Sequence, residues 1–485
     1  MFVLGGYPLA LRKQIAESTA SYTDPYLGVN LRESEEHLKD GESRLMQNCW
    51  RNGGVRIRTG SSNLNASSYG AYRTLGGHKY YYGGATPAAK RLIAYHNTIS
   101  VVSDAPAETV LTTGMTAGLR TYFSTWSITD SVYISNGTDT PRKYDGTTFS
   151  TVTKPGGKTN NPPIARGPLC PILDRMMAIS PYGIERTDPR VDNVWSSNSS
   201  WATLRPQTPG LFTALTPYSI RGADSIYPGI IAFQERAHYL VTGTNFGADV
   251  EAATAGTGED GSIKLLDPSV GTASPDSVCS VPGIGLFWFT TDLNVYWMPE
   301  GSLTGRYVGD KLQSTGSTAG IESTNTAALA GVWMKYFDHM LILSIPTGSS
   351  VYASTQFWMD MRELRNHPER GPVWYGPMIG QTVSCAWVEN QQGDNTLRGG
   401  EGNSSTGVFV YTLRVPSVFT DAVGTADNNI TMIYQTPFKD FGTTSREKYV
   451  QAIHADCNEF AGTATVDLLD LEGALATNIP LEEVV

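Results

Sequence analysis

Short runs of apolar residues alternate with polar positions along most of this chain, and each run ends at Gly, Asn, Asp or Pro. Runs of this kind occupy residues 91–95, 131–135, 230–233, 238–241, 285–289 and 340–344. An alternation with a period of two residues between turn residues is typical of β-strands. Two pairs of runs flank short turns, 286–290 with 295–298 and 332–337 with 340–345. These pairs predict antiparallel hairpins.

Strand pairs continue from about residue 71 to about residue 420 with no convincing helix between them. This pattern favours an array of sandwiches or a β-propeller. At about 40–50 residues for each blade, the region holds seven or eight blades, or six with long insertions. A propeller leaves only short, protected strand edges. The sequence therefore predicts an all-β protein with a β-propeller-like core, although it contains no WD or kelch signature.

The two ends of the chain are predicted to form a small additional β platform. Residues 1–70 form an N-terminal arm, in which 38–49 could hold a short helix or turn and 50–60 form a hairpin. We expect Arg56 and Arg58 of this hairpin to lie on a solvated face. Residues 421–485 form a C-terminal β-unit that joins the platform. Within the propeller-like domain, 71–420, insertions are expected near 154–171, which is rich in Pro, and near 245–277, which is rich in Gly, Ala, Thr and Asp.

Composition supports this interpretation. Charged residues make up 17% of the chain, against roughly 25% in an average soluble protein. The formal net charge is −10, and a protein that grips nucleic acid usually presents a basic face. Five widely spaced cysteines without a CxxC motif indicate reduced thiols rather than a zinc or redox site.

Catalytic and cofactor motifs are weak or missing. The segment 256–261 matches GxGxxG, but it lacks the preceding strand and following helix of a dinucleotide-binding loop. The histidines show no HExxH spacing, and no GxSxG, P-loop or sialidase Asp-box motif occurs. We therefore assign no catalytic, cofactor-binding or metal-binding residues and expect no enzyme activity. No apolar run of 18 residues occurs that would predict a membrane-spanning segment.

The aromatic clusters in the sequence allow two interpretations. The residues Tyr80-Tyr81-Tyr82, Trp374-Tyr375 and Trp195 could stack on sugars or on partner subunits if they were exposed. The simpler interpretation is that they pack between strands in the core. We favour the core.

Several segments, in order, resemble a known family. The opening residues 28–35, 38–42 and 48–60 resemble a pattern of the form LxDGE…NxxxRxGxxxxRxG. Residues 133–139 with 144–149 resemble an NGxD…YDGxxW blade in which Phe149 replaces the Trp, and 233–243 resemble an FxxRxYxxxG strand pair. Residues 356–380, 399–400 and 407–411 resemble late blades, and 435–437 with 448–449 resemble the closing unit. The family is that of bacteriophage tail nozzle, or tail tubular, proteins of the packaged-DNA stabilisation type.

This resemblance implies a structural subunit of a short phage tail. Such a subunit forms a homo-oligomeric ring, with six copies expected, below the portal or its adaptor. The implied partners are other copies, portal and adaptor proteins, tail fibres or tailspikes, and double-stranded DNA that passes without specific binding. The implied location is the virion tail, after assembly in the host cytoplasm.

Acidic residues of the 245–277 insertion are our candidates for the channel or its gate. They are Asp249, Glu251, Glu259 and Asp260. The alternative is an ordinary solvated loop. Alternatives to the tail ring are a receptor-binding or fibre-anchoring virion protein and a carbohydrate-active propeller enzyme.

Overall fold

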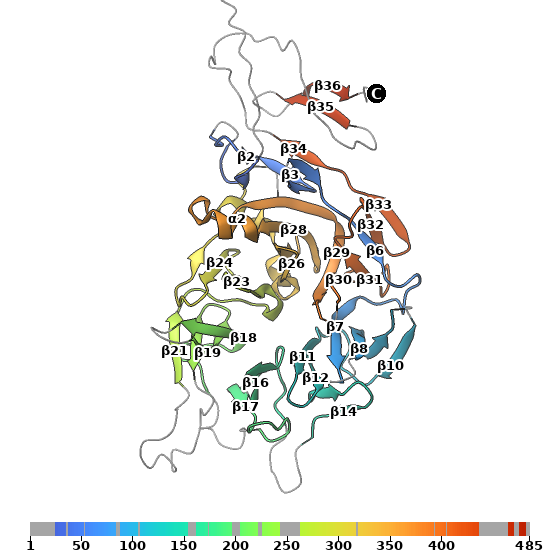
Figure 1. Cartoon of the computed structure of the whole chain (residues 1–485), viewed down its shortest axis with the longest axis vertical. Coiled ribbons are helices and arrows are strands. Elements are labelled where there is room, and N and C mark those ends of the chain that lie inside the picture. The colour runs from blue at the N-terminus through green and yellow to red at the C-terminus, as the bar shows by residue number, and fades with distance from the viewer. Residues whose placement is uncertain are drawn as a thin grey trace, which may run out of the picture.

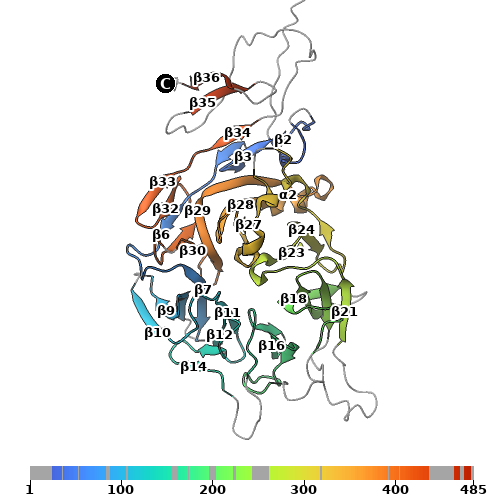
Figure 2. The same ribbon diagram turned by 180° about the vertical axis from the view of Figure 1, so that it is seen from behind.

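The protein is described by a computed structural model that covers most of the chain. Described are residues 25–435, except for gaps at 35–36, 53, 84–87, 105–106, 154–161, 173, 196–203, 222–225, 243–261, 317–318, 392 and 404, together with 464–469 and 475–481. In this part of the chain almost all regular structure is β. Figures 1 and 2 show the strands as small sheets arranged around a common centre, seen from opposite sides.

The first four blades follow the chain in order. Blade 1 contains β7 (Thr74–Tyr82), β8 (Ala88–Tyr95), β9 (Thr98–Val102) and β10 (Glu108–Thr112). Blade 2 contains β11 (Tyr122–Trp126), β12 (Ser131–Ser135), β13 (Arg142–Tyr144) and β14 (Phe149–Thr151). Blade 3 contains β15 (Cys170–Ile172), β16 (Arg175–Ser180) and β17 (Gly183–Arg186). Blade 4 contains β18 (Phe212–Arg221), β19 (Ile226–Gln234), β20 (His238–Thr242) and β21 (Ser262–Asp267).

Three further blades complete the ring. Blade 5 contains β22 (Val278–Val281), β23 (Gly285–Phe289), β24 (Val295–Pro299) and β25 (Arg306–Tyr307). Blades 6 and 7 share one sheet, made of β26 (Trp333–Phe337), β27 (Met340–Ile345), β28 (Ala353–Asp360), β29 (Trp374–Glu389), β30 (Thr396–Glu401), β31 (Val410–Leu413) and β6 (Ser61–Asn63). The described residues therefore form a β-propeller of seven blades, a number within the range of six to eight that the sequence allowed.

Blades 6 and 7 are joined through β29. Its first part pairs with β28, and from Val383 onward it pairs with β30. It is thus the outer strand of blade 6 and the inner strand of blade 7. The strand β6 comes from the N-terminal segment and pairs with β31, with Ser61 opposite Leu413. The ring is therefore closed by a strand far away in the sequence, which ties the start of the chain to its last blade.

The platform is built from both ends of the propeller sequence. Its sheets are β1 (Gly28–Val29) with β2 (Glu42–Ser43), β3 (Leu45–Gln47) with β34 (Ile433–Gln435), β4 (Cys49–Arg51) with β5 (Val55–Ile57), and β32 (Thr420–Val423) with β33 (Ala426–Asn429). Strands β1, β3, β4 and β32 all contact β29. The platform therefore lies on the rim of the ring beside blades 6 and 7 (Figure 1). A hairpin of β35 (Ala464–Leu469) and β36 (Leu475–Leu481) follows later in the chain.

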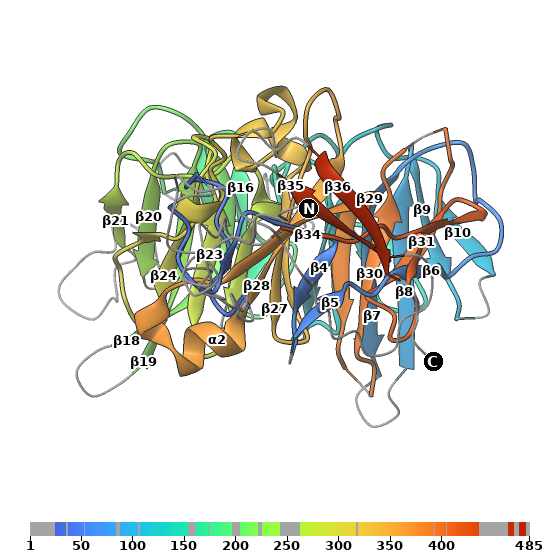
Figure 3. The ribbon, with the colours of Figure 1, turned by 90° about the horizontal axis from the view of Figure 1, so that it is seen from above.

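Helical structure is short. It comprises α2 (Met361–Asn366), η1 (Pro275–Ser277), η2 (Asp310–Leu312), η3 (Ile321–Ser323), η4 (Thr326–Gly331) and η5 (Pro368–Arg370). The carboxylate of Asp360 caps α2 by accepting a hydrogen bond from the backbone N–H of Arg362. In the edge-on view of Figure 3, α2 lies outside the blades, and the strands cross the thickness of the disc.

Two local expectations were wrong. Residues 38–49, where we expected a short helix or turn, contain β2, β3 and the start of β4. The insertion near 245–277 is not a loop throughout, because 262–267 form β21, the outer strand of blade 4. In both cases pairing with a neighbouring strand outweighs the turn-rich local composition. The insertion near 154–171 is irregular over its described residues 162–169, and β15 begins at Cys170.

Candidate functional site

A charged cluster lies in the central bore of the propeller. The inner strands β7, β11, β15, β18, β22, β26 and β29 follow one another around the bore. Arg120 lies just before β11, and Asp276 lies in η1 just before β22. Ser384 is near the point where β29 becomes the inner strand of blade 7. All three therefore lie at the face of the disc where the inner strands begin, which we call the entry face.

Arg120 and Asp276 meet across the bore. The guanidinium Nε and Nη2 of Arg120 lie 2.8 and 2.6 Å from Oδ2 of Asp276. Nη1 of Arg120 donates to the carbonyl of Ser384 at 2.9 Å, and Nζ of Lys335 in β26 lies 3.7 Å from Oδ1 of Asp276. Arg120 belongs to blade 2 and Asp276 to blade 5, which lie on opposite sides of a ring of seven. This axial cluster of Arg120, Asp276 and Lys335 therefore spans the bore at the entry face.

The charges in the axial cluster stabilise one another. Burial by itself would raise the pKa of Asp276, but the positive charges of Arg120 and Lys335 hold that pKa below its usual value. Burial raises the pKa of the Cys279 thiol to about 11 and also raises that of Cys385. The cluster thus keeps an ionised carboxylate beside two cations and beside protonated, unreactive thiols.

A second set of ion pairs joins blade 7 to blade 1, where the ring closes. Arg91 in β8 binds Glu389 at the end of β29, and Lys79 in β7 lies 3.7 Å from the same carboxylate. Arg398 in β30 lies 3.5 Å from Glu389. Asp104 pairs with Arg91 at 2.8 Å, and Asp394 pairs with Lys79 at 2.8 Å. We call these six residues the closure network, because it joins the last blade to the first.

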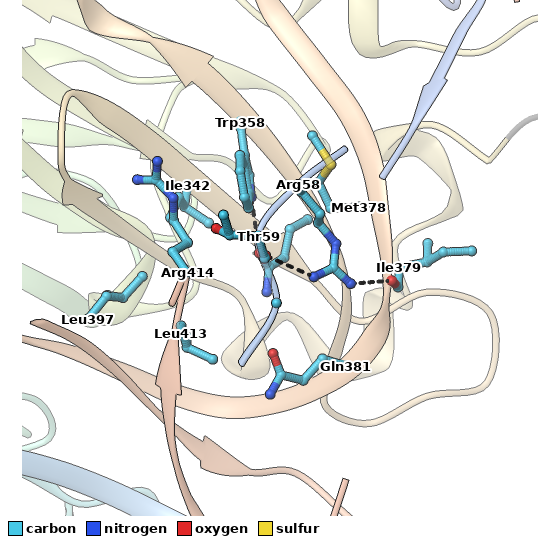
Figure 4. Close-up of a pocket in the computed structure, with 12 residues that line it drawn as sticks. Arg58, Thr59, Ile342, Trp358, Met378, Ile379, Gln381, Leu397, Leu413 and Arg414 are labelled. Carbon is cyan, nitrogen blue, oxygen red and sulfur yellow. Dashed lines mark hydrogen bonds between the residues drawn. The ribbon is translucent and has the colours of Figure 1, made fainter. Parts of the chain in front are cut away.

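Arg58 anchors the platform to the propeller. Its Nη1 donates to Oδ1 of Asp421 at 2.9 Å, its Nη2 to the carbonyl of Ile379 at 2.7 Å, and its Nε to Oδ1 of Asn48 at 3.0 Å. Figure 4 shows the guanidinium of Arg58 pointing to Ile379, beside a cavity of about 20 Å³, which is room for about one water molecule. Our expectation of a solvated Arg58 was therefore wrong, whereas Arg56 is exposed as expected.

The predicted gate residues Asp249, Glu251, Glu259 and Asp260 lie outside the described residues. The residues of the axial cluster were missed by the sequence interpretation, because nothing in the sequence relates positions 120, 276 and 335. The side chains of Tyr80, Trp374, Tyr375 and Trp195 are buried, so the interpretation as core residues is confirmed for them. The cysteines Cys49, Cys170, Cys279 and Cys385 are free and buried.

The described part of the chain contains neither a cluster of metal-binding side chains nor a helix that could cross a membrane. Those residues contain no group of three or more His, Cys, Asp or Glu side chains that could hold a metal ion. Their helices are all too short or too polar to span a bilayer.

Comparison with known proteins identifies no family. No family model matches the sequence, and no curated protein matches it. Among solved structures, the WD40 β-propeller domain of Doa1 is 9% identical, with coverage of 74% of this chain and 98% of that chain and a TM-score of 0.40. BBS1N in complex with ARL6DN is 10% identical, with coverage of 75% and 99% and a TM-score of 0.42. YCF48 bound to D1 peptide is 10% identical, with coverage of 73% and 97% and a TM-score of 0.38.

Proposed function

We propose that this chain is a non-enzymatic structural subunit of a short bacteriophage tail, a nozzle or tail-tube ring protein that sits below the portal or its adaptor. The resemblance of its motifs, in order along the sequence, is the starting point. The observation that carries the proposal further is the ion pair between Arg120 and Asp276 across the bore. Because that pair occupies the bore, we propose that the DNA channel is formed between copies of the chain and not through each propeller.

The closed ring supports a mechanical role. Blade 7 takes its outer strand β6 from the N-terminal segment, and the closure network joins blade 7 to blade 1. Opening the disc requires both the separation of paired strands and the exposure of buried charges, which is costly. A rigid disc of this kind suits a wall that withstands the pressure of packaged DNA.

The platform supports assembly with other subunits. The platform and the adjoining part of β29 expose large apolar side chains, namely Phe419, Met432 and Ile433 of the platform and Ile379 of β29. They lie on neighbouring segments, since Asn48 bonds the backbone of both Ile379 and Thr431 and the N–H of Ile430 donates to the carbonyl of Phe419. We call these four residues the platform patch. Exposed apolar groups that cluster in this way typify interaction surfaces, and we propose a second copy of the chain as their occupant.

In this proposal the ring contains six copies, binds portal or adaptor proteins on one side and fibres or tailspikes on the other, and resides in the virion tail. The net charge of −10 suits a wall past which DNA moves without being held, because each Lys or Arg contact with phosphate adds affinity. No sequence-specific DNA binding is expected.

The test is the oligomeric state of the full chain, alone and with the portal–adaptor complex of the phage that encodes it. Light scattering and electron microscopy should show a ring of six chains of 52.5 kDa, 315 kDa in total. Phe419→Asp with Met432→Asp should abolish the ring and leave folded monomers. Tyr182→Asp, at a tyrosine 71% exposed in the turn before β17, is the matched control and should still assemble. A chain that stays monomeric with the portal–adaptor complex present contradicts the proposal.

A further inference from the structure

A polar hollow of about 150 Å³ lies between blades 4 and 5. Its wall from blade 4 is Ser269 and Val270, which follow the outer strand β21. Its wall from blade 5 is the β23–β24 turn with Thr290, Asp292 and Asn294, and Tyr296 of β24 completes it. Figure 1 shows β21 and β24 in adjacent blades on one side of the ring. The volume is similar to that of cavities that admit one six-membered ring.

The hydrogen bonds within the wall determine what it offers to a ligand. Oδ1 of Asn294 already accepts from Nε2 of Gln313 at 3.0 Å, so its amide Nδ2 is left to donate. Oγ1 of Thr290 accepts from the backbone N–H of Asn294 at 3.1 Å, so the hydroxyl proton of Thr290 is also left to donate.

The wall of the hollow also contains hydrogen-bond acceptors. Oγ of Ser269 donates to Asp267 at 2.7 Å and keeps its lone pairs for the hollow. The carboxylate of Asp292 is exposed, and among the described residues none donates a hydrogen bond to it. The wall of the hollow therefore presents both donors and acceptors.

The hydroxyl of Tyr296 is held in its protonated form. Burial raises the pKa of Tyr296, and the negative charges of Asp267 and Asp292 raise it further. The ring of Tyr296 stacks on Trp288, with centroids 5.7 Å apart, and contacts Tyr307 on the next strand. These neighbours hold the ring of Tyr296 in place where it lines the hollow.

We propose that this hollow binds one ring of a neutral saccharide. Sugar hydroxyls both donate and accept, which matches the mixed wall of Asp292, Asn294 and Tyr296. A bare divalent cation would need oxygen acceptors only, whereas the Asn294 amide and the Thr290 hydroxyl also present donors. An anion would meet the charge of Asp292, and none of the six lining residues carries a positive charge. This inference does not depend on the proposed ring.

The test is a titration of the full chain, followed by saturation-transfer NMR. The probes are the methyl glycosides of α-D-glucose, β-D-galactose and N-acetyl-β-D-glucosamine, with calcium chloride as a separate arm. At least one glycoside should bind at millimolar concentration. Tyr296→Phe removes only the hydroxyl and should weaken that binding about tenfold, as should Asp292→Ala.

A matched control separates binding from folding. Asp427→Asn changes an exposed carboxylate on the platform and should leave the affinity unchanged. Equal thermal unfolding of all variants shows that the fold is intact. Three results overturn the proposal: no glycoside of the panel binds, the two hollow variants bind as the wild type does, or calcium binds and is lost in Asp292→Ala while the glycosides do not bind.

Discussion

Arg91 and Glu389 form a bidentate ion pair between the first and last blades, with Nε and Nη2 lying 2.6 and 2.9 Å from the two carboxylate oxygens. Both side chains are 1% exposed. Lys79 and Arg398 approach the same carboxylate. One buried anion therefore holds three cations at the point where the ring closes.

Glu389→Gln should destabilise the fold strongly. The amide keeps the shape but leaves Arg91, Lys79 and Arg398 without their shared buried counter-charge, which typically costs about 3–5 kcal/mol. Urea unfolding gives the difference in free energy. The matched control is Glu369→Gln, at an exposed carboxylate outside the network. A similar unfolding midpoint for both variants would show that the closure network adds little.

His78 should make the fold sensitive to mild acid. Burial lowers the pKa of His78 from 6.5 to about 4, and its ring bonds Oγ1 of Thr125 at 2.8 Å between blades 1 and 2. The unfolded chain therefore binds more protons than the folded chain between pH 6.5 and about 4. Stability is fully present above pH 6.5 and falls through this window, by on the order of 1–3 kcal/mol.

The measurement is the free energy of unfolding in urea at pH 7 and pH 5 for wild type and His78→Gln. The variant should lose less stability on acidification than the wild type. His367→Gln, at an exposed histidine, should behave as the wild type does. His238 contributes in the same direction, since burial also lowers its pKa, so part of the slope should remain in His78→Gln. If His78→Gln loses as much stability on acidification as the wild type does, groups other than His78 account for the whole pH dependence.

Much of the architecture could be predicted from alternation alone. The hairpins at 286–298 and 332–345 appear as β23–β24 and β26–β27, because their turns and apolar faces are local features. The hairpin at 50–60 likewise appears as β4–β5. Strands that depend on distant partners were not predicted. The segment 42–47 becomes extended because β3 pairs with β34, almost 400 residues later.

The candidate sites were much harder to predict than the fold. Arg58 looks like an ordinary solvated strand residue until Asp421 and the carbonyl of Ile379 are placed around it. Arg120 and Asp276 can form an ion pair only because blades 2 and 5 face each other across the bore. No local sequence motif signals either contact, because each contact depends on how many blades the ring contains and on where the ring closes.

Arg58→Ala should loosen the platform. The change leaves Asp421, which is 2% exposed, without its buried counter-charge, and it removes the Arg58 donors to the carbonyl of Ile379 and to Oδ1 of Asn48. We expect a loss of about 3–5 kcal/mol and faster proteolysis in the platform than in the blades. Arg56→Ala, two residues away and exposed, is the control. Equal proteolysis patterns for the two variants would contradict an anchoring role for Arg58.

Gly77→Ala should disturb the contact between blades 1 and 7. A Cβ at position 77 would lie 2.3 Å from the indole ring of Trp387, which is buried and cannot withdraw easily. Overpacking of this kind typically costs about 1–3 kcal/mol. Gly114→Ala, whose added Cβ would meet its nearest neighbour at 3.5 Å, should be close to neutral. Tryptophan fluorescence during urea unfolding measures the stability of both variants. Equal unfolding midpoints would show that Trp387 moves aside without a cost in stability.

Asp276→Asn should weaken the axial cluster in a salt-dependent way. Without the carboxylate charge, Arg120 and Lys335 remain close together in the bore and repel each other. Both are partly accessible, with side chains 21% and 26% exposed, so we expect a loss of about 1–3 kcal/mol, below that of a fully buried pair. Added salt screens the repulsion and should recover part of this loss.

The decisive comparison is the urea midpoint of Asp276→Asn at low and high sodium chloride. Adding Lys335→Met should restore stability, since only one cation then remains in the bore. Asp310→Asn breaks the exposed pair with Arg32, whose side chains are about half exposed, and should cost less than about 1 kcal/mol. If the double variant is no more stable than Asp276→Asn, the two cations do not oppose each other, and the bore holds enough water to separate them.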